Sequence, residues 1–150
     1  MATSPAQLIE LTTRRRLRHE PEASAEIFVV FTCPRLTTAA LKKAGVLAGR
    51  LRAHALMLLA RIVPYPLALV TPPAALSFDE GRIRSIAGCP VETRVLLCLC
   101  RDEWDMLTMA LTSNSIVVIG RRKRWWPTRE ARLARRLRHA GHFVIFAEAE

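Results

Sequence analysis

Hydrophobic residues are concentrated in five short runs, separated by segments that are more polar or have helical spacing. The runs lie at residues 27–32, 55–63, 91–100, 116–119 and 143–147. The first of them, IFVVFT, is a continuous series of apolar, β-branched and aromatic residues. Such a run is typical of a strand buried on both faces of a sheet. Five strands are therefore predicted.

Three of the intervening segments are predicted to be helical. Thr37 or Thr38 can cap a helix that reaches about residue 53, and Asp102 or a neighbour begins a second helix that ends near residue 111. Pro127 suits the first turn of a third helix, and Gly141 is a natural stop for it. The proline-rich segment 64–90 is less regular, with room for a short helix only at residues 74–86.

The alternation of strands and helices predicts an α/β fold, with a parallel sheet covered by helices on both faces. In such a sheet ligands bind beyond the carboxyl ends of the strands, where the strand order reverses. Thr32, Val63 and the loop at residues 120–126 follow or end predicted strands. They are therefore expected at the binding edge.

Length and composition predict one domain at residues 27–150, preceded by a mobile polar leader at residues 1–26. The leader has no hydrophobic segment of the kind found in secretory signals, and no apolar run is long enough to cross a bilayer. A cytoplasmic protein without a membrane partner is expected. The four cysteines form no CxxC pair and are interpreted as reduced thiols, not as a metal site.

The positive charge is concentrated in one part of the chain. Of the formal net charge of +10, the segment from Gly120 to His142 contributes +8, from nine cations and Glu130. This concentration predicts attraction of an anionic partner without identifying it. In the loop RRKRWWPTR, Trp125 and Trp126 could stack on nucleic-acid bases. The favoured alternative is that they pack on the sheet edge or on a partner subunit, so nucleic acid stays a minor hypothesis.

No Walker-type loop, nucleophile elbow or cluster of metal ligands appears in the sequence, and a protein that is not an enzyme is expected. The carboxylates Asp102, Glu103 and Asp105 fall in the first turn of a predicted helix. There they stabilise the helix dipole, which is the preferred explanation over acid–base chemistry.

Several segments together resemble the universal stress protein family. They are IFVVFTCPRLTTAAL, HALMLLARIVPYP, VETRVLL, SNSIVVIG and RLARRLRHAGHFVIFAE. The resemblance covers residues 27–148 and implies a Rossmann-like α/β/α sandwich with five parallel strands in the order 3-2-1-4-5. It also implies a stress-response role and a homodimer formed through the last strand.

The chain departs from the family at its nucleotide-binding motif. Members that bind nucleotide carry Gly-x2-Gly-x9-Gly-Ser/Thr, and counting from Gly120 places Lys123, Leu133 and Ala134 at the other three positions. Thr32 stands where those members have an acidic residue, whereas Val63 keeps the expected type. Because glycines let the backbone approach phosphate closely, the changes predict loss of the ATP-binding cradle.

Two hypotheses follow. The first is a universal-stress-protein-like regulatory module that needs no cofactor and acts by protein association. The second is a protein that binds a nucleotide, such as ATP, or another phosphate-bearing anion through the basic loop at residues 121–124. Its predicted site residues are Thr32, Val63, Gly120, Arg121, Arg122 and Lys123.

Overall fold

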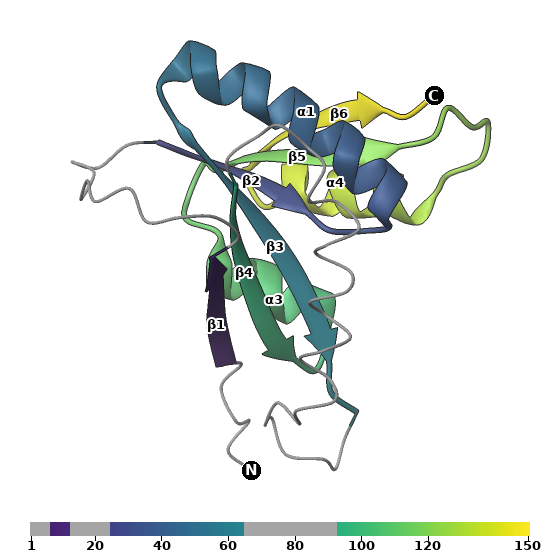
Figure 1. Ribbon diagram of the computed structural model, residues 1–150. Helices are drawn as coiled ribbons and strands as arrows, with labels where there is room; N and C mark the ends of the chain where they lie inside the picture. The colour runs from purple at the N-terminus through teal and green to yellow at the C-terminus, as the bar shows by residue number, and fades with distance from the viewer. Residues whose placement is uncertain (1–6, 13–24, 65–92) are drawn as a thin grey trace.

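The computed structural model describes residues 7–12, 25–64 and 93–150 of the 150-residue chain. Within these ranges the chain forms one six-stranded sheet with the order β1-β4-β3-β2-β5-β6 (Figure 1). The strands are β1 (Gln7–Thr12), β2 (Glu26–Val30), β3 (His54–Ile62), β4 (Thr93–Cys100), β5 (Ile116–Arg121) and β6 (Phe143–Glu148).

The five strands β2 to β6 pair in parallel. Counted from β2, their order is 3-2-1-4-5, so the predicted sheet is confirmed. The sixth strand, β1, was not expected from the sequence. It pairs antiparallel with β4 along its whole length, from Gln7 opposite Leu99 to Thr12 opposite Arg94. It lies within the segment interpreted as a leader, whose residues 1–6 and 13–24 are outside the described part of the chain.

Helices cover both faces of this sheet (Figure 1). Helix α1 (Pro34–Leu51) packs on one face over β2, β3, β5 and β6. Helices α3 (Glu103–Ala110) and α4 (Arg129–His139) pack on the other, α3 over β3 and β4 and α4 over β5 and β6. The predicted proline-rich segment and its short helix at residues 74–86 lie outside the described residues.

Two hydrophobic clusters, one on each face, form the core. Successive side chains of a strand point to opposite faces. In β2, Ile27 and Val29 belong to the cluster under α1, while Phe28 and Val30 belong to the cluster under α3 and α4. All four are at most 2% exposed. Burial on both faces explains why the sequence of this strand is continuously apolar instead of alternating.

Two predicted helix starts need correction. Helix α1 begins at Pro34 with Cys33 as its N-cap, earlier than Thr37 or Thr38. Proline suits the first turn because a backbone N–H at that position has no hydrogen-bond partner within the helix. Helix α4 is capped by Thr128, whose hydroxyl accepts from the N–H of Ala131, so Pro127 precedes the helix.

The other helix ends agree with the sequence. Asp102 caps α3, and its Oδ1 accepts a hydrogen bond of 3.2 Å from the N–H of Trp104. Gly141 follows α4 with a φ of +95°, a left-handed conformation that favours glycine. These two residues fix where α3 begins and where α4 ends.

Candidate functional site

The candidate site is the carboxyl edge of the parallel strands. The strand order reverses at β2, which pairs with β3 on one side and with β5 on the other. In an open α/β sheet the crevice at such a reversal is the expected ligand position. Thr32, Val63 and Gly120 all lie at this edge, as predicted, because they follow or end β2, β3 and β5.

Thr32 lines a cavity of about 300 Å³ at this edge. The other lining residues are Phe31, Ala60, Arg61, Ile62, Glu103 and Arg129. The Thr32 N–H donates a 3.2 Å hydrogen bond to the Thr37 hydroxyl, which fixes the turn between β2 and α1. The Thr32 Oγ1 is buried and has no hydrogen-bond partner among the described residues. The cavity volume of about 300 Å³ is at the lower limit for ordinary small-molecule pockets.

An ion pair joins two of the residues that line this cavity. A guanidinium nitrogen of Arg129, at the start of α4, donates to a carboxylate oxygen of Glu103, at the start of α3. The Glu103 side chain is only 16% exposed. The pair ties the first turns of the two helices together and engages one of the two arginines that line the cavity in an internal contact.

Val63 contributes its backbone to the structure and does not line the Thr32 cavity. Its N–H donates to the Cys100 carbonyl at 2.8 Å, extending the pairing of β3 with β4. Its carbonyl accepts a 3.1 Å hydrogen bond from Arg101. Both backbone polar groups of Val63 are therefore engaged within the protein.

Gly120 is held against the first turn of α1. A Cβ built on Gly120 would lie 2.0 Å from the Leu36 carbonyl oxygen and 2.5 Å from the Leu36 carbonyl carbon. Real Cβ atoms almost never approach other atoms closer than 3.0 Å. This glycine therefore has a packing reason that is independent of any ligand: it lets β5 and α1 approach each other.

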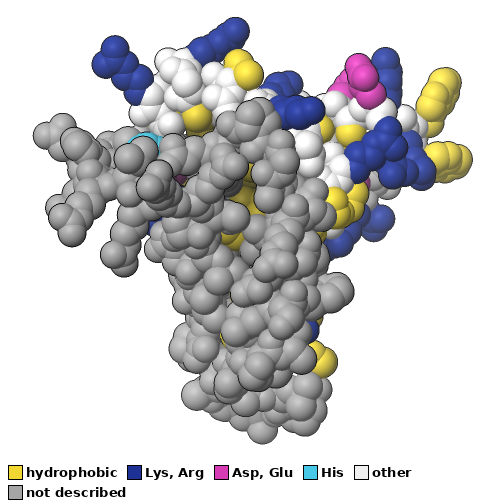
Figure 2. Space-filling view, viewed as in Figure 1, with side chains coloured by type: hydrophobic (Ala, Val, Ile, Leu, Met, Phe, Trp, Pro, Cys, Tyr) yellow, Lys and Arg dark blue, Asp and Glu magenta, His cyan; other side chains and the backbone are white. Residues whose placement is uncertain are grey.

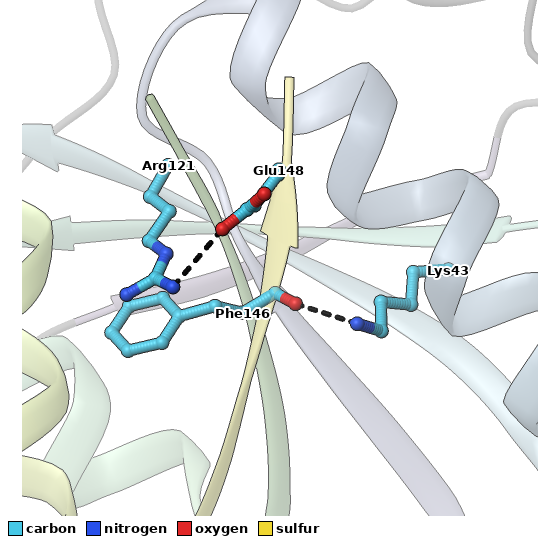
Figure 3. A network of polar contacts seen from close by, with 4 residues as sticks. All are labelled: Lys43, Arg121, Phe146 and Glu148. Atoms are coloured by element: carbon cyan, nitrogen blue, oxygen red, sulfur yellow. Dashed lines mark hydrogen bonds and ion pairs between the residues drawn. The ribbon is translucent and has the colours of Figure 1, made fainter. Parts of the chain in front are cut away.

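Arg121 points toward β6 and takes part in a contact there (Figure 3). Its Nη2 lies 3.2 Å from Glu148 Oε1, and its guanidinium carbon lies 4.3 Å from the centre of the Phe146 ring. The guanidinium of Arg121, a predicted anion-binding residue, is therefore already in contact with Glu148 and Phe146. From the opposite side of β6, Lys43 of α1 donates to the Phe146 carbonyl at 2.7 Å.

The β5–α4 loop, residues 122–128, is the most exposed part of the predicted site. Arg122, Lys123 and Arg124 are exposed and have no hydrogen bond or ion pair among the described residues. Trp125 is fully exposed, and Trp126 is 82% exposed. Figure 2 shows cationic and hydrophobic side chains gathered on the side of the molecule where this loop lies in Figure 1. The expectation that the tryptophans pack on the sheet edge is wrong.

The last two positions of the family motif face the protein interior. Leu133 packs against the cluster under α4, and Ala134 is completely buried within it. Their side chains therefore belong to the core side of α4. Only Lys123, of the three changed motif positions, is exposed at the loop.

The arginines of α4 divide into engaged and free side chains. Arg129 pairs with Glu103, Arg136 lies 4.0 Å above the Trp104 ring, and Arg138 donates to the Val144 carbonyl at 3.1 Å. Arg132 and Arg135 are exposed and have no partner among the described residues. The sequence alone could not separate these groups, because all five arginines share one amphipathic helix.

Buried thiols lie away from this edge loop, on β4. Cys98 and Cys100 are both 0% exposed and share the face of the sheet under α3. The hydrogen bond with Cys98, together with burial, raises the pKa of Cys100. Among the described residues there is no group of three or more side chains able to hold a metal ion. Both thiols pack in the core under α3.

The fold has a known counterpart. The chain is similar to the structure of the universal stress protein from Archaeoglobus fulgidus in complex with dAMP, with a TM-score of 0.55 and 17% sequence identity. The match covers 82% of this chain and 97% of that chain. At this identity the likeness establishes the α/β fold alone. No protein-family model matches the chain, and no curated protein matches it. None of the described helices is long and apolar enough to span a membrane.

Proposed function

We propose that this chain is a non-enzymatic regulatory binding module with a universal-stress-protein-like fold, whose working surface is the β5–α4 loop. Its partner there carries negative charge. The observation that supports this most directly is that Arg122, Lys123 and Arg124 are all exposed and unpaired among the described residues. Unpaired cations in a cluster attract anions and accelerate their encounter with the protein.

The same geometry argues against nucleotide binding in the manner of the family. Arg129 and Glu103, which line the small cavity beside Thr32, are paired with each other. Arg121 is held by Glu148 and Phe146, so the anion-binding set shifts from residues 121–123 to residues 122–124. Lys123 adds a long side chain where a backbone amide would need close approach to phosphate. The proposed ligand therefore binds to side chains on the surface of the loop, with no resident cofactor.

Thermal unfolding with inorganic tripolyphosphate and with ATP tests this proposal. A ligand present at 100 times its Kd stabilises the folded state by about 2.7 kcal/mol, which raises the Tm of a domain of this size by about 5–11 °C. We expect both anions to act, because the cations of the loop, and not the crevice beside Thr32, would bind them.

The matched variants are a loop variant and a control variant. Arg122→Gln/Lys123→Gln/Arg124→Gln removes the three loop cations. Lys42→Gln/Arg50→Gln/Arg52→Gln removes three exposed cations of α1 and its C-cap, on the other face of the sheet. The loop variant should lose the stabilisation and the control should keep it. Equal responses of the two variants would refute the proposal.

A second candidate is protein association through β6, as a homodimer. Strand β6 lies at the end of the sheet order, and its first residue, Phe143, is 64% exposed. Two carbonyls of β6 are nevertheless occupied: Val144 accepts from Arg138, and Phe146 accepts from Lys43. The Phe143 N–H is turned inward to Ser115 on the chain entering β5, so these alternate carbonyls face the outer edge.

A partner strand would have to displace the side chains of Arg138 and Lys43 or pair around them, since occupied edge groups oppose further strand pairing. Light scattering coupled to gel filtration, at concentrations up to about the micromolar range typical of modest dimers, tests this candidate. It predicts a dimer that Phe143→Lys weakens. A monomeric wild type would exclude it, and a dimer that forms only in Lys43→Gln/Arg138→Gln would show that the two cations protect the edge.

A further inference from the structure

The partner of the β5–α4 loop can be assigned more narrowly from the two tryptophans. Trp125 is fully exposed, and Trp126 is 82% exposed. Two adjacent large aromatic side chains in water are uncommon in a monomer unless they serve binding. They follow three free cations directly in the sequence. The loop therefore joins flat apolar surfaces to positive charge.

The free cations continue beyond the loop onto α4. Arg132 and Arg135 are three residues apart, so they lie on one side of the helix. Both are exposed and unpaired among the described residues. Two acids near this surface are already engaged, Glu103 with Arg129 and Glu148 with Arg121. The first turn of α4 adds one acid, Glu130, against the nine cations between Gly120 and His142. Five uncompensated cations thus flank the tryptophans from both directions along the chain.

This arrangement does not suit a small enclosed ligand. None of the five free cations lines the cavity beside Thr32, the cavity beside His142 or the cavity beside Lys42. A compact anion binds best where several donors converge in a pocket. Cations spread over an exposed loop and helix instead fit a partner whose negative charges are also spread out.

We infer that the β5–α4 loop and α4 bind single-stranded nucleic acid. Phosphates of the strand would contact Arg122, Lys123, Arg124, Arg132 and Arg135, and unpaired bases would stack on Trp125 and Trp126. Stacking is available to every base, so little sequence preference is expected. A duplex already stacks its bases internally and cannot offer their faces. This inference rests on the proposed function and specifies its anion.

A membrane surface is the competing partner for a loop with tryptophan and arginine. Interfacial helices present a broad apolar face to the lipid. The exposed large hydrophobic residues of the described chain include none from α4, whose outer face is cationic. Two indoles are a small apolar area beside five charges, so the single strand is the better fit.

The test uses the full chain and fluorescein-labelled dT12, with binding followed by anisotropy at several NaCl concentrations. Release of counterions from a single strand gives a slope of about −0.7 per phosphate contact in a plot of log K against log salt concentration. Five contacts predict a slope of about −3.5. The loop variant, in which residues 122–124 are glutamine, keeps only the contacts of Arg132 and Arg135 and should retain a slope of about −1.4. The α1 control variant, with the same change in net charge, should keep the wild-type slope.

Trp125→Ala/Trp126→Ala tests stacking separately from charge. Loss of one stacked base weakens binding about 5- to 150-fold, so the double variant should bind dT12 at least 5-fold more weakly at unchanged salt slope. The same variant should bind tripolyphosphate like the wild type, because that anion has no base. In this double variant dT12 should no longer quench the tryptophan fluorescence. The one remaining tryptophan, Trp104, is not in the loop that would stack on the bases.

The outcomes separate this inference from the function on which it rests. Binding of tripolyphosphate through the loop cations, without tighter or tryptophan-dependent binding of dT12, would overturn the inference and leave the proposed function standing. A duplex that binds as tightly as dT12 with no role for the tryptophans would also overturn it. So would vesicles of 30% phosphatidylserine that bind through both tryptophans while dT12 does not. If neither anion distinguishes the loop variant from the control, both proposals fail.

Discussion

Replacing Gly120 by alanine separates the structural role of this residue from a ligand-binding role. The added Cβ would lie 2.0 Å from the Leu36 carbonyl oxygen, 2.5 Å from its carbonyl carbon and 2.9 Å from its Cα. The shortest of these distances is about 1 Å below the 3.0 Å limit that real Cβ atoms keep. All three atoms belong to the backbone of α1, so no side-chain rotation can relieve the clash.

The helix and strand must therefore separate by about 1 Å, the shortfall just given. This movement would loosen Leu36, Ala40 and Ala44 of α1, which are at most 6% exposed in the core. Overpacking of a core costs about 1–3 kcal/mol and occasionally more. Since the obstacle is backbone, we expect a loss of about 3 kcal/mol or more in the free energy of unfolding. That loss corresponds to a decrease of about 6–12 °C in the Tm.

Urea unfolding followed by far-UV circular dichroism measures the change, with Gly49→Ala as the matched control. Gly49 lies in α1, and a Cβ there meets nothing within 4 Å. Alanine should stabilise that helix by about 0.5–1 kcal/mol. The argument would be refuted by a Gly120→Ala protein with wild-type stability, above all if its binding of tripolyphosphate were the property that changed.

Three further predictions concern the elements around the site. Asp102→Ala removes the N-cap of α3 and should lower the free energy of unfolding by about 1 kcal/mol in urea titrations; no loss would show that the 3.2 Å hydrogen bond to Trp104 contributes nothing. A double-mutant cycle of Glu103→Gln and Arg129→Gln should give a coupling of about 0.2–1 kcal/mol, because the Arg129 side chain is 70% exposed, and a coupling above 3 kcal/mol would contradict this assignment. The hydrogen bond with Cys98, together with burial, raises the pKa of Cys100, so the unfolded thiol ionises first and stability should fall as the pH rises above about 8.5. The same hydrogen bond lowers the pKa of Cys98, so the loss should stay below the value of about 1.4 kcal/mol per pH unit for one proton. Urea unfolding between pH 7.5 and 9.5 should show this loss in the wild type and not in Cys98→Ala/Cys100→Ala, and an equal pH dependence of the two proteins would remove the pair of thiols as the cause.

The order of the elements could be predicted from the sequence because the signals are local. A strand buried on both faces must be continuously apolar, and β2 is recognised in this way within one residue of its observed start at Glu26. The caps at Asp102 and Gly141 depend only on their immediate neighbours. The starts of α1 and α4 were misplaced by a few residues, because cysteine, proline and threonine compete for the cap in CPRLTT, and proline and threonine compete for it in WWPTR.

The candidate site could be predicted only in outline. The alternation of strands and helices placed the loop at residues 120–126 at the carboxyl edge, since a loop after a parallel strand must lie there. The partners of the arginines are distant in sequence: Arg121 meets Glu148, and Arg129 meets Glu103, each across more than 20 residues. No local pattern reveals which arginines are neutralised.

The sequence by itself determined the α/β class, the parallel strands and the concentration of charge after Gly120, because hydrophobic periodicity and composition are properties of neighbouring residues. Only the tertiary structure decided which cations are free, that both loop tryptophans are exposed, and that Gly120 touches Leu36. It also added β1 on the outer side of β4. These facts depend on distances between residues far apart in the chain, and burial and pairing are set by such distances, not by residue type.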